Sequence, residues 1–247
     1  MSIITYNEAI SITKEFGKEL SQRFGKQILA VFAIGSLGAD YYRPGQSDID
    51  TAVIADIPRS ELWELKANIR EIANKYCEQY SVPKGFGAVV ISKEQLSPPY
   101  IKNEELILEI LRLKTQSKAI YGTFDTESIP TPSKSAIIED ARAFEEWAEN
   151  MRRIDPYFGI SDTVSLVNST LMILKRYLMI ERDIIEFNKF KVLQLYLKND
   201  PPIVYDELFE YIDASIYNHG PIVSTERLKE LTAMHDLVYE KINKICL

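Results

Sequence analysis

The chain has 247 residues, of which 46% are hydrophobic and 26% are charged, and this balance excludes an intrinsically disordered protein. The length allows one large hydrophobic core or two smaller ones. Because 29 basic residues stand against 36 acidic ones, for a formal net charge of -7, the composition argues against a broad surface that binds long nucleic acid.

The first half of the sequence alternates between helical and strand patterns. Apolar residues at helical spacing predict helices over residues 6–24, 59–80 and 104–116. Short apolar runs that are rich in β-forming residues predict strands over residues 27–35, 48–55, 85–92 and 118–122. The order of these elements indicates an α/β (α+β) sheet domain, which we place at residues 1–124.

A change in composition follows the sheet domain. Residues 122–135 gather Gly, Pro, Ser and Thr, which is typical of a linker. Beyond it, apolar residues at spacings of three and four predict helices over residues 134–153, 161–183, 189–200 and 225–245. We therefore expect an all-α helical bundle domain at residues 136–247.

Export and membrane signals are missing from the sequence. No apolar run reaches 18 residues, and the N-terminal segment has no basic stretch followed by an apolar one. The two cysteines, Cys77 and Cys246, lie far apart and form no metal-binding pattern. We expect a cytoplasmic protein with reduced thiols and no contact with a membrane.

The segment AIGSLGADYYRPGQSDIDTAVI, residues 33–54, contains the first sign of chemistry. On a strand, residues two apart face the same way, so Asp48 and Asp50 are expected to project together while Ile49 packs into the core. Two carboxylates this close repel each other unless a cation lies between them. Such a pair provides part of an octahedral magnesium shell, and waters and substrate phosphates complete it.

Residues on either side of this pair suit a polyphosphate. Gly35 lets the backbone approach a ligand closely, and Ser36 adds a hydroxyl and an N–H group. Lys175 and Arg176 stand in a very apolar helical segment, where a cation must either reach solvent or meet an anion. We take Lys175 as the better candidate for a contact with the phosphates.

The pattern of an apolar strand, Gly-Ser, about a dozen residues and Asp-x-Asp in a second strand resembles the nucleotidyltransferases of the DNA polymerase beta type. The matching residues are Gly35, Ser36, Ser47, Asp48 and Asp50. Within that family, the chain length and the helical second half look most like the adenylyltransferases that inactivate aminoglycoside antibiotics.

The resemblance implies an activity and a set of roles. It implies Mg²⁺-dependent transfer of a nucleoside monophosphate, AMP from ATP, to a hydroxyl of a small molecule, with an aminoglycoside-type antibiotic as one acceptor. Asp48 and Asp50 are then the metal ligands and the catalytic residues. Gly35, Ser36 and Ser47 then bind the nucleotide, and the helical domain offers a surface through which two copies could form a homodimer.

One departure from the family pattern bears on catalysis. The family normally has a third carboxylate on a later strand, facing the pair. Here that strand reads GFGAVVIS, and Gly87, Ala88 or Val89 stands where the acid is expected. The base could come from elsewhere, and the acidic candidates are Glu94, Glu104, Glu145 and Glu146.

Other functions stay open at this point. One is a degenerate nucleotidyltransferase that binds nucleotide without efficient transfer, as GFGAVVIS suggests. Another is an antitoxin-like nucleotidyltransferase that modifies a protein, although residues 136–247 lack the Arg-x4-6-His motif of the partner ribonucleases. A nucleic-acid polymerase or tailing enzyme fits the acidic composition poorly.

Two features of the helical half allow more than one interpretation. The acidic segment IIEDARAFEEWAEN, residues 137–150, could line a pocket for a polycationic substrate or form a solvated helix face. His219 and His235 have no evident metal partner or nucleophile in the sequence, which favours surface or interface positions for both.

Overall fold

The computed structural model describes residues 3–39, 41–45, 47–82, 85–99, 106–154, 163–199 and 225–245. The chain forms two compact units. The first, which we call the sheet unit, comprises Met1–Ile101 and Leu108–Thr131. The second, the helical unit, comprises Lys102–Ile107 and Pro132–Leu247.

A four-stranded sheet organises the sheet unit, and all four predicted strands are confirmed. The strands are β1 (Ile28–Ile34), β2 (Ile49–Ala55), β3 (Phe86–Ser92) and β4 (Lys118–Gly122). They lie in the order β3-β2-β1-β4. β1 pairs with β2 and with β4 in antiparallel fashion, whereas β2 and β3 run parallel. Antiparallel neighbours need only short connections, but the parallel pair requires a crossover, which a helix provides.

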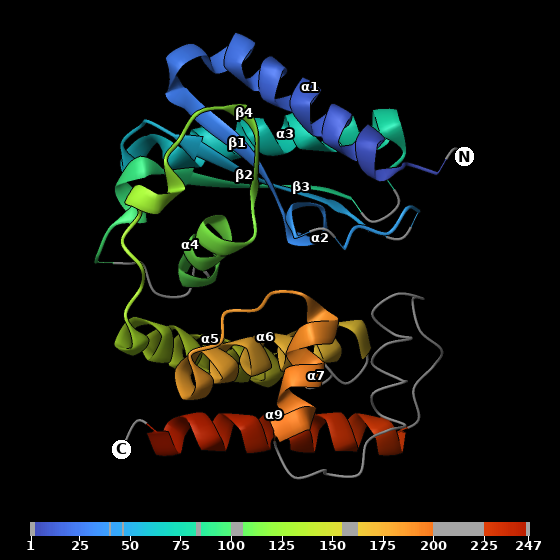
Figure 1. Ribbon diagram of the computed structural model, residues 1–247, viewed down its shortest axis with the longest axis vertical. Helices are drawn as coiled ribbons and strands as arrows, with labels where there is room; N and C mark the ends of the chain where they lie inside the picture. Colours follow the sequence, from blue (N-terminus) through green and yellow to red (C-terminus); the bar gives the residue numbers. More distant parts are fainter. Residues whose placement is uncertain are drawn as a thin grey trace. The chain divides into compact units, whose positions relative to one another are not determined.

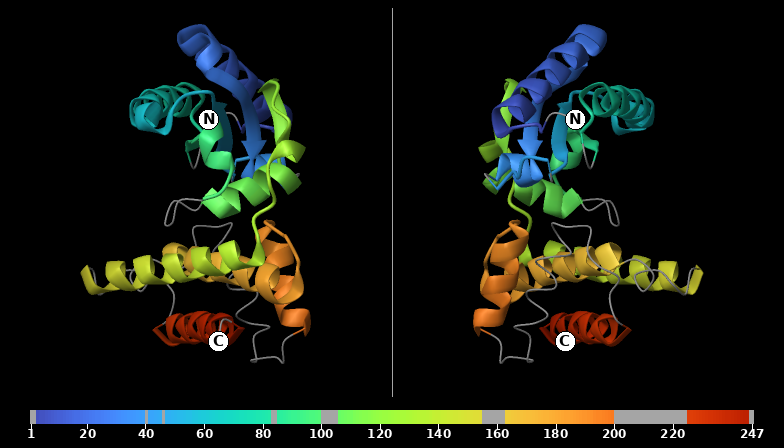
Figure 2. Two further views of the ribbon diagram at one scale, coloured as in Figure 1. Left: turned by 90° about the vertical axis from the view of Figure 1, so that its left-hand side faces the viewer. Right: turned by 90° about the vertical axis from the view of Figure 1, so that its right-hand side faces the viewer.

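Helices cover both faces of this sheet. They are α1 (Tyr6–Phe24), α2 (Gly35–Gly38), α3 (Leu62–Tyr80) and α4 (Leu106–Thr115), with short 3-10 turns η1 (Gly25–Gln27), η2 (Arg59–Glu61), η3 (Lys93–Leu96) and η4 (Thr126–Ser128). Helices α1 and α3 lie on one face and α4 on the other (Figures 1 and 2). The crossover from β2 to β3 runs through α3.

Helix α1 shows how the sequence fixes the first layer. Thr5 accepts a hydrogen bond from the backbone N–H of Glu8, and the Glu8 side chain accepts one from the backbone N–H of Thr5, which forms a capping box. The buried stripe of this helix consists of Ala9, Ile12, Thr13, Phe16, Gly17 and Leu20. Its spacing of three and four is the one that the sequence predicts.

The core between the sheet and the helices α1 and α3 decides which way β2 faces. Phe16 packs against Phe86 with ring centroids 4.8 Å apart. The same buried cluster includes Ile49 and Val53 of β2 and Ile69 of α3. Because side chains alternate along a strand, Ile49, Thr51 and Val53 face this core. Asp50 and Ala52 face the other side of the sheet. This alternation turns Asp50 away from α1 and α3.

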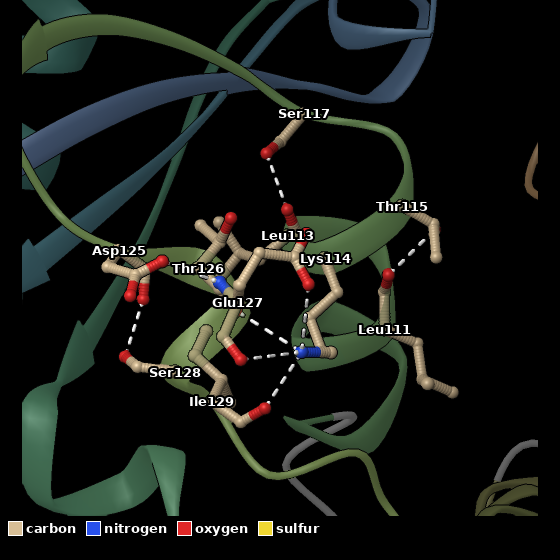
Figure 3. Close-up of polar contacts among 10 residues, drawn as sticks. All are labelled: Leu111, Leu113, Lys114, Thr115, Ser117, Asp125, Thr126, Glu127, Ser128 and Ile129. Atoms are coloured by element: carbon tan, nitrogen blue, oxygen red, sulfur yellow. Dashed lines mark hydrogen bonds and ion pairs between the residues drawn. The ribbon is translucent and has the colours of Figure 1, made fainter.

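The segment after β4, expected to be a linker, is partly fixed to the sheet unit. The ammonium group of Lys114, at the end of α4, donates hydrogen bonds to the carbonyl oxygens of Thr126 at 3.3 Å, Glu127 at 3.4 Å and Ile129 at 2.8 Å (Figure 3). Ile129 is itself buried. The Gly, Pro, Ser and Thr content indicates a turn-rich segment correctly, but it does not reveal that a lysine anchors the segment to α4.

The helical unit contains α5 (Lys134–Ile154), α6 (Thr163–Arg182), α7 (Lys189–Asn199) and α9 (Thr225–Ile245). Each corresponds to a helix that the sequence predicts. Helix α6 packs against α5, α7 and α9. Within the described parts of both units, no helix is long and apolar enough to cross a membrane.

Candidate active site

Asp48 and Asp50 lie at the start of β2 and alternate with buried residues. Ser47, Ile49 and Thr51 are buried, while Asp48 and Asp50 are both partly exposed. Asp48 directly precedes β2, and Asp50 is the second residue of that strand. The alternation along β2 turns Asp50 away from the core formed with α1 and α3. That the Asp48 carboxylate projects beside that of Asp50 stays a prediction.

The carboxylate of Asp50 sits between two glycines. A β-carbon at Gly35 would lie 2.7 Å from Asp50 Oδ2, and a β-carbon at Gly87 would lie 2.6 Å from Asp50 Oδ1. Gly35 also has a φ of +61°, a conformation that other residues adopt rarely. Gly35 is therefore required both for its backbone conformation and for the space beside the acid.

Ser36 is the second residue of the short helix α2, directly after this glycine. Its hydroxyl oxygen is buried and has no hydrogen-bond partner among the described residues. Leaving a buried hydroxyl unsatisfied costs about 1 to 3 kcal/mol. This cost is offset when a ligand oxygen accepts a hydrogen bond from the hydroxyl, so the Ser36 side chain marks a place where a polar ligand would fit.

The loop before β2 is held by its own hydrogen bonds. The hydroxyl oxygen of Ser47 accepts a hydrogen bond from the backbone N–H of Arg43 at 3.0 Å, and the Ser47 N–H donates to the Arg43 carbonyl at 3.0 Å. Ser47 thus fixes the turn that leads into Asp48. Nearby, burial raises the pKa of Tyr42, and the negative charges of Asp48 and Glu8 raise that pKa further.

The pairing of β2 with β3 identifies the residue beside Asp50. In the parallel register Asp50 is the partner of Gly87, and Thr51 that of Ala88. The Thr51 hydroxyl donates a hydrogen bond to the Gly87 carbonyl at 2.9 Å, which supports this register. Gly87, Ala88 and Val89 are the three positions at which the family pattern would place a third acid. Of these, Gly87 is the one that lies beside Asp50.

Residues 13–116 match the family model described as a nucleotidyltransferase domain. The chain therefore carries a nucleotidyltransferase domain over these residues. No curated protein matches the sequence.

Solved structures resemble the chain to different extents. The spectinomycin adenyltransferase AAD(9) from Enterococcus faecialis, solved with ATP and spectinomycin, matches it with a TM-score of 0.62 at 19% sequence identity. That match covers 96% of this chain and 99% of the other, and it shows that the fold is shared.

Two weaker similarities concern toxin–antitoxin complexes. One, solved with AMP-PNP, has a TM-score of 0.30 and 18% identity over 58% of this chain and 96% of that chain. The other, the tri-AMPylated Shewanella oneidensis HEPN toxin with the MNT antitoxin, has a TM-score of 0.28 and 16% identity over 60% of this chain and 97% of that chain. At these scores neither similarity supports an argument about this chain.

Glu94 lies too far from Asp50 to act as the missing base. It follows the end of β3, where Ser92 is the partner of Ala55. Ser92 lies five residues beyond Gly87, a separation of about 16 Å at the usual rise of a strand. Glu94 also accepts a hydrogen bond from the backbone N–H of Arg59 at 3.1 Å, at that far end of the sheet.

The other acidic candidates for the base belong to the helical unit. Glu104 lies outside the described residues. Glu145 Oε1 lies 2.6 Å from Nε2 of His235. Glu146 is exposed on α5. The expected surface or interface position of His235 is wrong, because its side chain is only 3% exposed; His219 lies outside the described residues.

The acidic segment of α5 contributes an inward-facing acid as well. Asp140 forms an ion pair with Arg176 of α6, with Nε and Oδ2 2.8 Å apart, and both side chains are buried. Arg176 also lies over the ring of Phe144. Asp140 stands three residues after buried Ile137, on the apolar face of the helix, and this spacing was the signal that it points inward.

Lys175 is a buried residue of α6. Its ammonium nitrogen lies 5.8 Å from the centre of the Phe187 ring and 4.0 Å from the sulfur of Met172. Gly35, Ser36, Asp48 and Asp50 belong to the sheet unit, whereas Lys175 belongs to the helical unit. Its contact with phosphates stays a prediction.

The residues at the start of β2 fit a single magnesium ion. Within the described ranges, no group of three or more His, Cys, Asp or Glu residues could hold a metal. Mg²⁺ does not need such a group, since it is usually bound by one or two carboxylates together with waters and substrate phosphates. Asp48 and Asp50 would provide the carboxylates, and the buried hydroxyl of Ser36 would provide a donor for a phosphate oxygen.

Proposed function

We propose that this nucleotidyltransferase transfers AMP from ATP to a hydroxyl of a small molecule, and that an aminoglycoside-type antibiotic is one such acceptor. The observation that carries the proposal is the Asp50 carboxylate packed against Gly35, which is followed directly by Ser36 with its unpartnered buried hydroxyl. The choice of ATP and of a small acceptor is supported by the shared fold with AAD(9), which was solved with ATP and spectinomycin.

Each residue has a defined part in this proposal. Asp48 and Asp50 would hold Mg²⁺, which when bound neutralises phosphate charge and stabilises the leaving pyrophosphate. Gly35 leaves room for the phosphates, and Ser36 donates a hydrogen bond to one of their oxygens. Ser47 holds the turn before Asp48 and would assist in binding the nucleotide. Lys175 would add positive charge near the triphosphate.

The chemical step is an in-line displacement at phosphorus. The acceptor oxygen forms a bond to the α phosphorus, the bond from that phosphorus to the bridging oxygen of the β phosphate breaks, and pyrophosphate leaves. The acceptor hydroxyl gives up its proton to a water molecule in the same process. Of the β3 residues beside Asp50, neither Gly87 nor Ala88 can accept that proton.

A second candidate function is favoured by this same glycine. A protein with Asp48 and Asp50 but without the third carboxylate could bind nucleotide and transfer it inefficiently. Loss of a general base typically lowers a rate about 10²- to 10⁴-fold. Titration calorimetry with ATP and Mg²⁺, run beside a pyrophosphate-release assay, separates the two, because a pure binder gives heat but no pyrophosphate.

The test of the proposed function is a label-transfer screen. Radiolabelled ATP, GTP, CTP and UTP are each offered with aminoglycosides, lincosamides and candidate proteins. We expect label from ATP on a small molecule with the wild type and none with the Asp48→Asn/Asp50→Asn variant. Asp56→Asn is the matched control, because Asp56 is an exposed acid just beyond the other end of β2. Label transfer that persists in the double variant would contradict the proposal.

A further inference from the structure

Gly87 is a glycine for reasons of space alone. Its backbone is not in the left-handed region, unlike that of Gly35, so β3 would accept another residue there as far as conformation is concerned. Glycine is a poor strand residue and often marks a point of close approach. What approaches is Asp50, whose Oδ1 lies 2.6 Å from where the β-carbon would be.

The carboxylate of Asp50 therefore extends into the space of a β3 side chain. Oδ1 lies toward Gly87 and Oδ2 toward Gly35. The hydrogen bond from Thr51 to the Gly87 carbonyl holds the two strands in the register that produces this arrangement. The place beside Asp50 is thus filled by Asp50 itself and is not free for a third acid from β3.

This arrangement bears on how many metal ions the site takes. In two-metal sites the ions are about 3.5 to 4 Å apart, and they clamp the attacking and leaving oxygens together. Two divalent ions that close repel each other strongly, so additional carboxylates are needed to hold the second. Asp48, Asp50 and a triphosphate supply enough negative charge for one Mg²⁺, and β3 adds none.

We propose that the site holds one divalent ion rather than two, and that Gly87 is a positioning residue that gives the Asp50 carboxylate its place. This inference rests on the proposed function, since the ion is the one that accompanies the nucleotide. It assigns to Gly87 a role in the metal site, although a glycine offers no ligand of its own.

Counting bound Mn²⁺ tests the number of ions directly. Electron paramagnetic resonance of the wild-type protein, saturated with a non-hydrolysable ATP analogue, reports free and bound Mn²⁺ during a titration. We expect one bound ion per chain. Two bound ions would overturn the inference and leave the proposed function intact, whereas no bound ion would overturn both.

A substitution at Gly87 tests the positioning role. In Gly87→Ala the new β-carbon must displace Asp50 Oδ1, and we expect Mn²⁺ affinity to fall about tenfold, as for other groups that orient a ligand. Val89→Ala is the matched control, because Val89 lies on the same side of β3 and is 39% exposed. Unchanged affinity in Gly87→Ala would overturn the role.

The thermal unfolding of Gly87→Ala and of Val89→Ala is also measured, in the absence of metal. Alanine suits a strand better than glycine, so Gly87→Ala should be at least as stable as the wild type. An affinity loss together with unchanged or raised stability separates a role at the ion from a merely structural one. The ion count of the wild type stands whatever this variant does.

Discussion

The acids at the start of β2 and the acids inside the helical unit differ in their exposure to solvent and in their neighbours. Asp140 and Glu145 are buried, and each contacts a buried basic side chain, Arg176 or His235. Asp48, directly before β2, and Asp50, the second residue of β2, are both partly exposed and are separated by the buried Ile49.

The difference teaches how to separate structural charges from functional ones in this chain. A buried charge must be paired, because desolvation makes a lone one very costly. Like charges two residues apart repel each other, so their arrangement points to a ligand of opposite charge. The following predictions test this distinction, from the largest expected effect to the smallest.

Asp48→Asn and Asp50→Asn should each lower nucleotidyl transfer about 10³-fold, because each removes a charge that holds the ion at the phosphates. The thermal midpoint of the metal-free protein should stay the same or rise, since a repulsion is relieved. Pyrophosphate release and calorimetric unfolding measure the two effects. A large drop in stability would mean that these acids serve the fold after all.

Arg176→Met should destabilise the protein by about 3 kcal/mol, because it leaves the buried carboxylate of Asp140 without its partner. Urea unfolding followed by circular dichroism measures this. Arg142→Met, at an exposed position of α5, should change stability by less than about 0.5 kcal/mol. Equal effects of the two substitutions would remove the distinction between buried and solvated charges in this unit.

Ser36→Ala should have opposite effects on stability and on binding. Without nucleotide, the loss of an unpartnered buried hydroxyl should leave the protein as stable or more stable. With ATP and Mg²⁺, affinity should fall about tenfold, which corresponds to one lost hydrogen bond to a charged group. Calorimetric titration measures the affinity, and a variant that binds ATP as the wild type does would exclude Ser36 from the site.

Tyr80→Phe should have the smallest effect. Tyr80 donates a 2.6 Å hydrogen bond to Glu15, and this bond, with partial burial, raises the pKa of Tyr80 above its ordinary value of 10.0. Loss of the bond should cost about 0.5 kcal/mol, because it is largely exposed to solvent.

The raised pKa also sets the sign of a pH dependence. The hydrogen bond from Tyr80 to Glu15 contributes fully to the free energy of unfolding below pH 10. This contribution is lost as the pH rises through the pKa of Tyr80 in the folded state. The stability difference between wild type and Tyr80→Phe should therefore shrink above pH 10. A difference that stays constant up to pH 12 would show that the hydrogen bond does not hold the tyrosine protonated.

Local patterns predicted the elements of this fold. The spacing of Ala9, Ile12 and Phe16 gives α1, and the alternation of buried and partly exposed residues around Ile49 is the one that the sequence predicts. The pairing of Asp50 with Gly87 could not be predicted, because the register of parallel strands depends on residues far apart in sequence. The contact of Glu145 with His235, 90 residues away, was missed for the same reason.

The most direct test of the account is a crystal structure with Mn²⁺ and a non-hydrolysable ATP analogue, examined for anomalous scattering. The account predicts one anomalous peak in contact with oxygen atoms of Asp48 and Asp50 and of the analogue's phosphates. Strong density for the analogue elsewhere, or a peak that neither acid contacts, would contradict it.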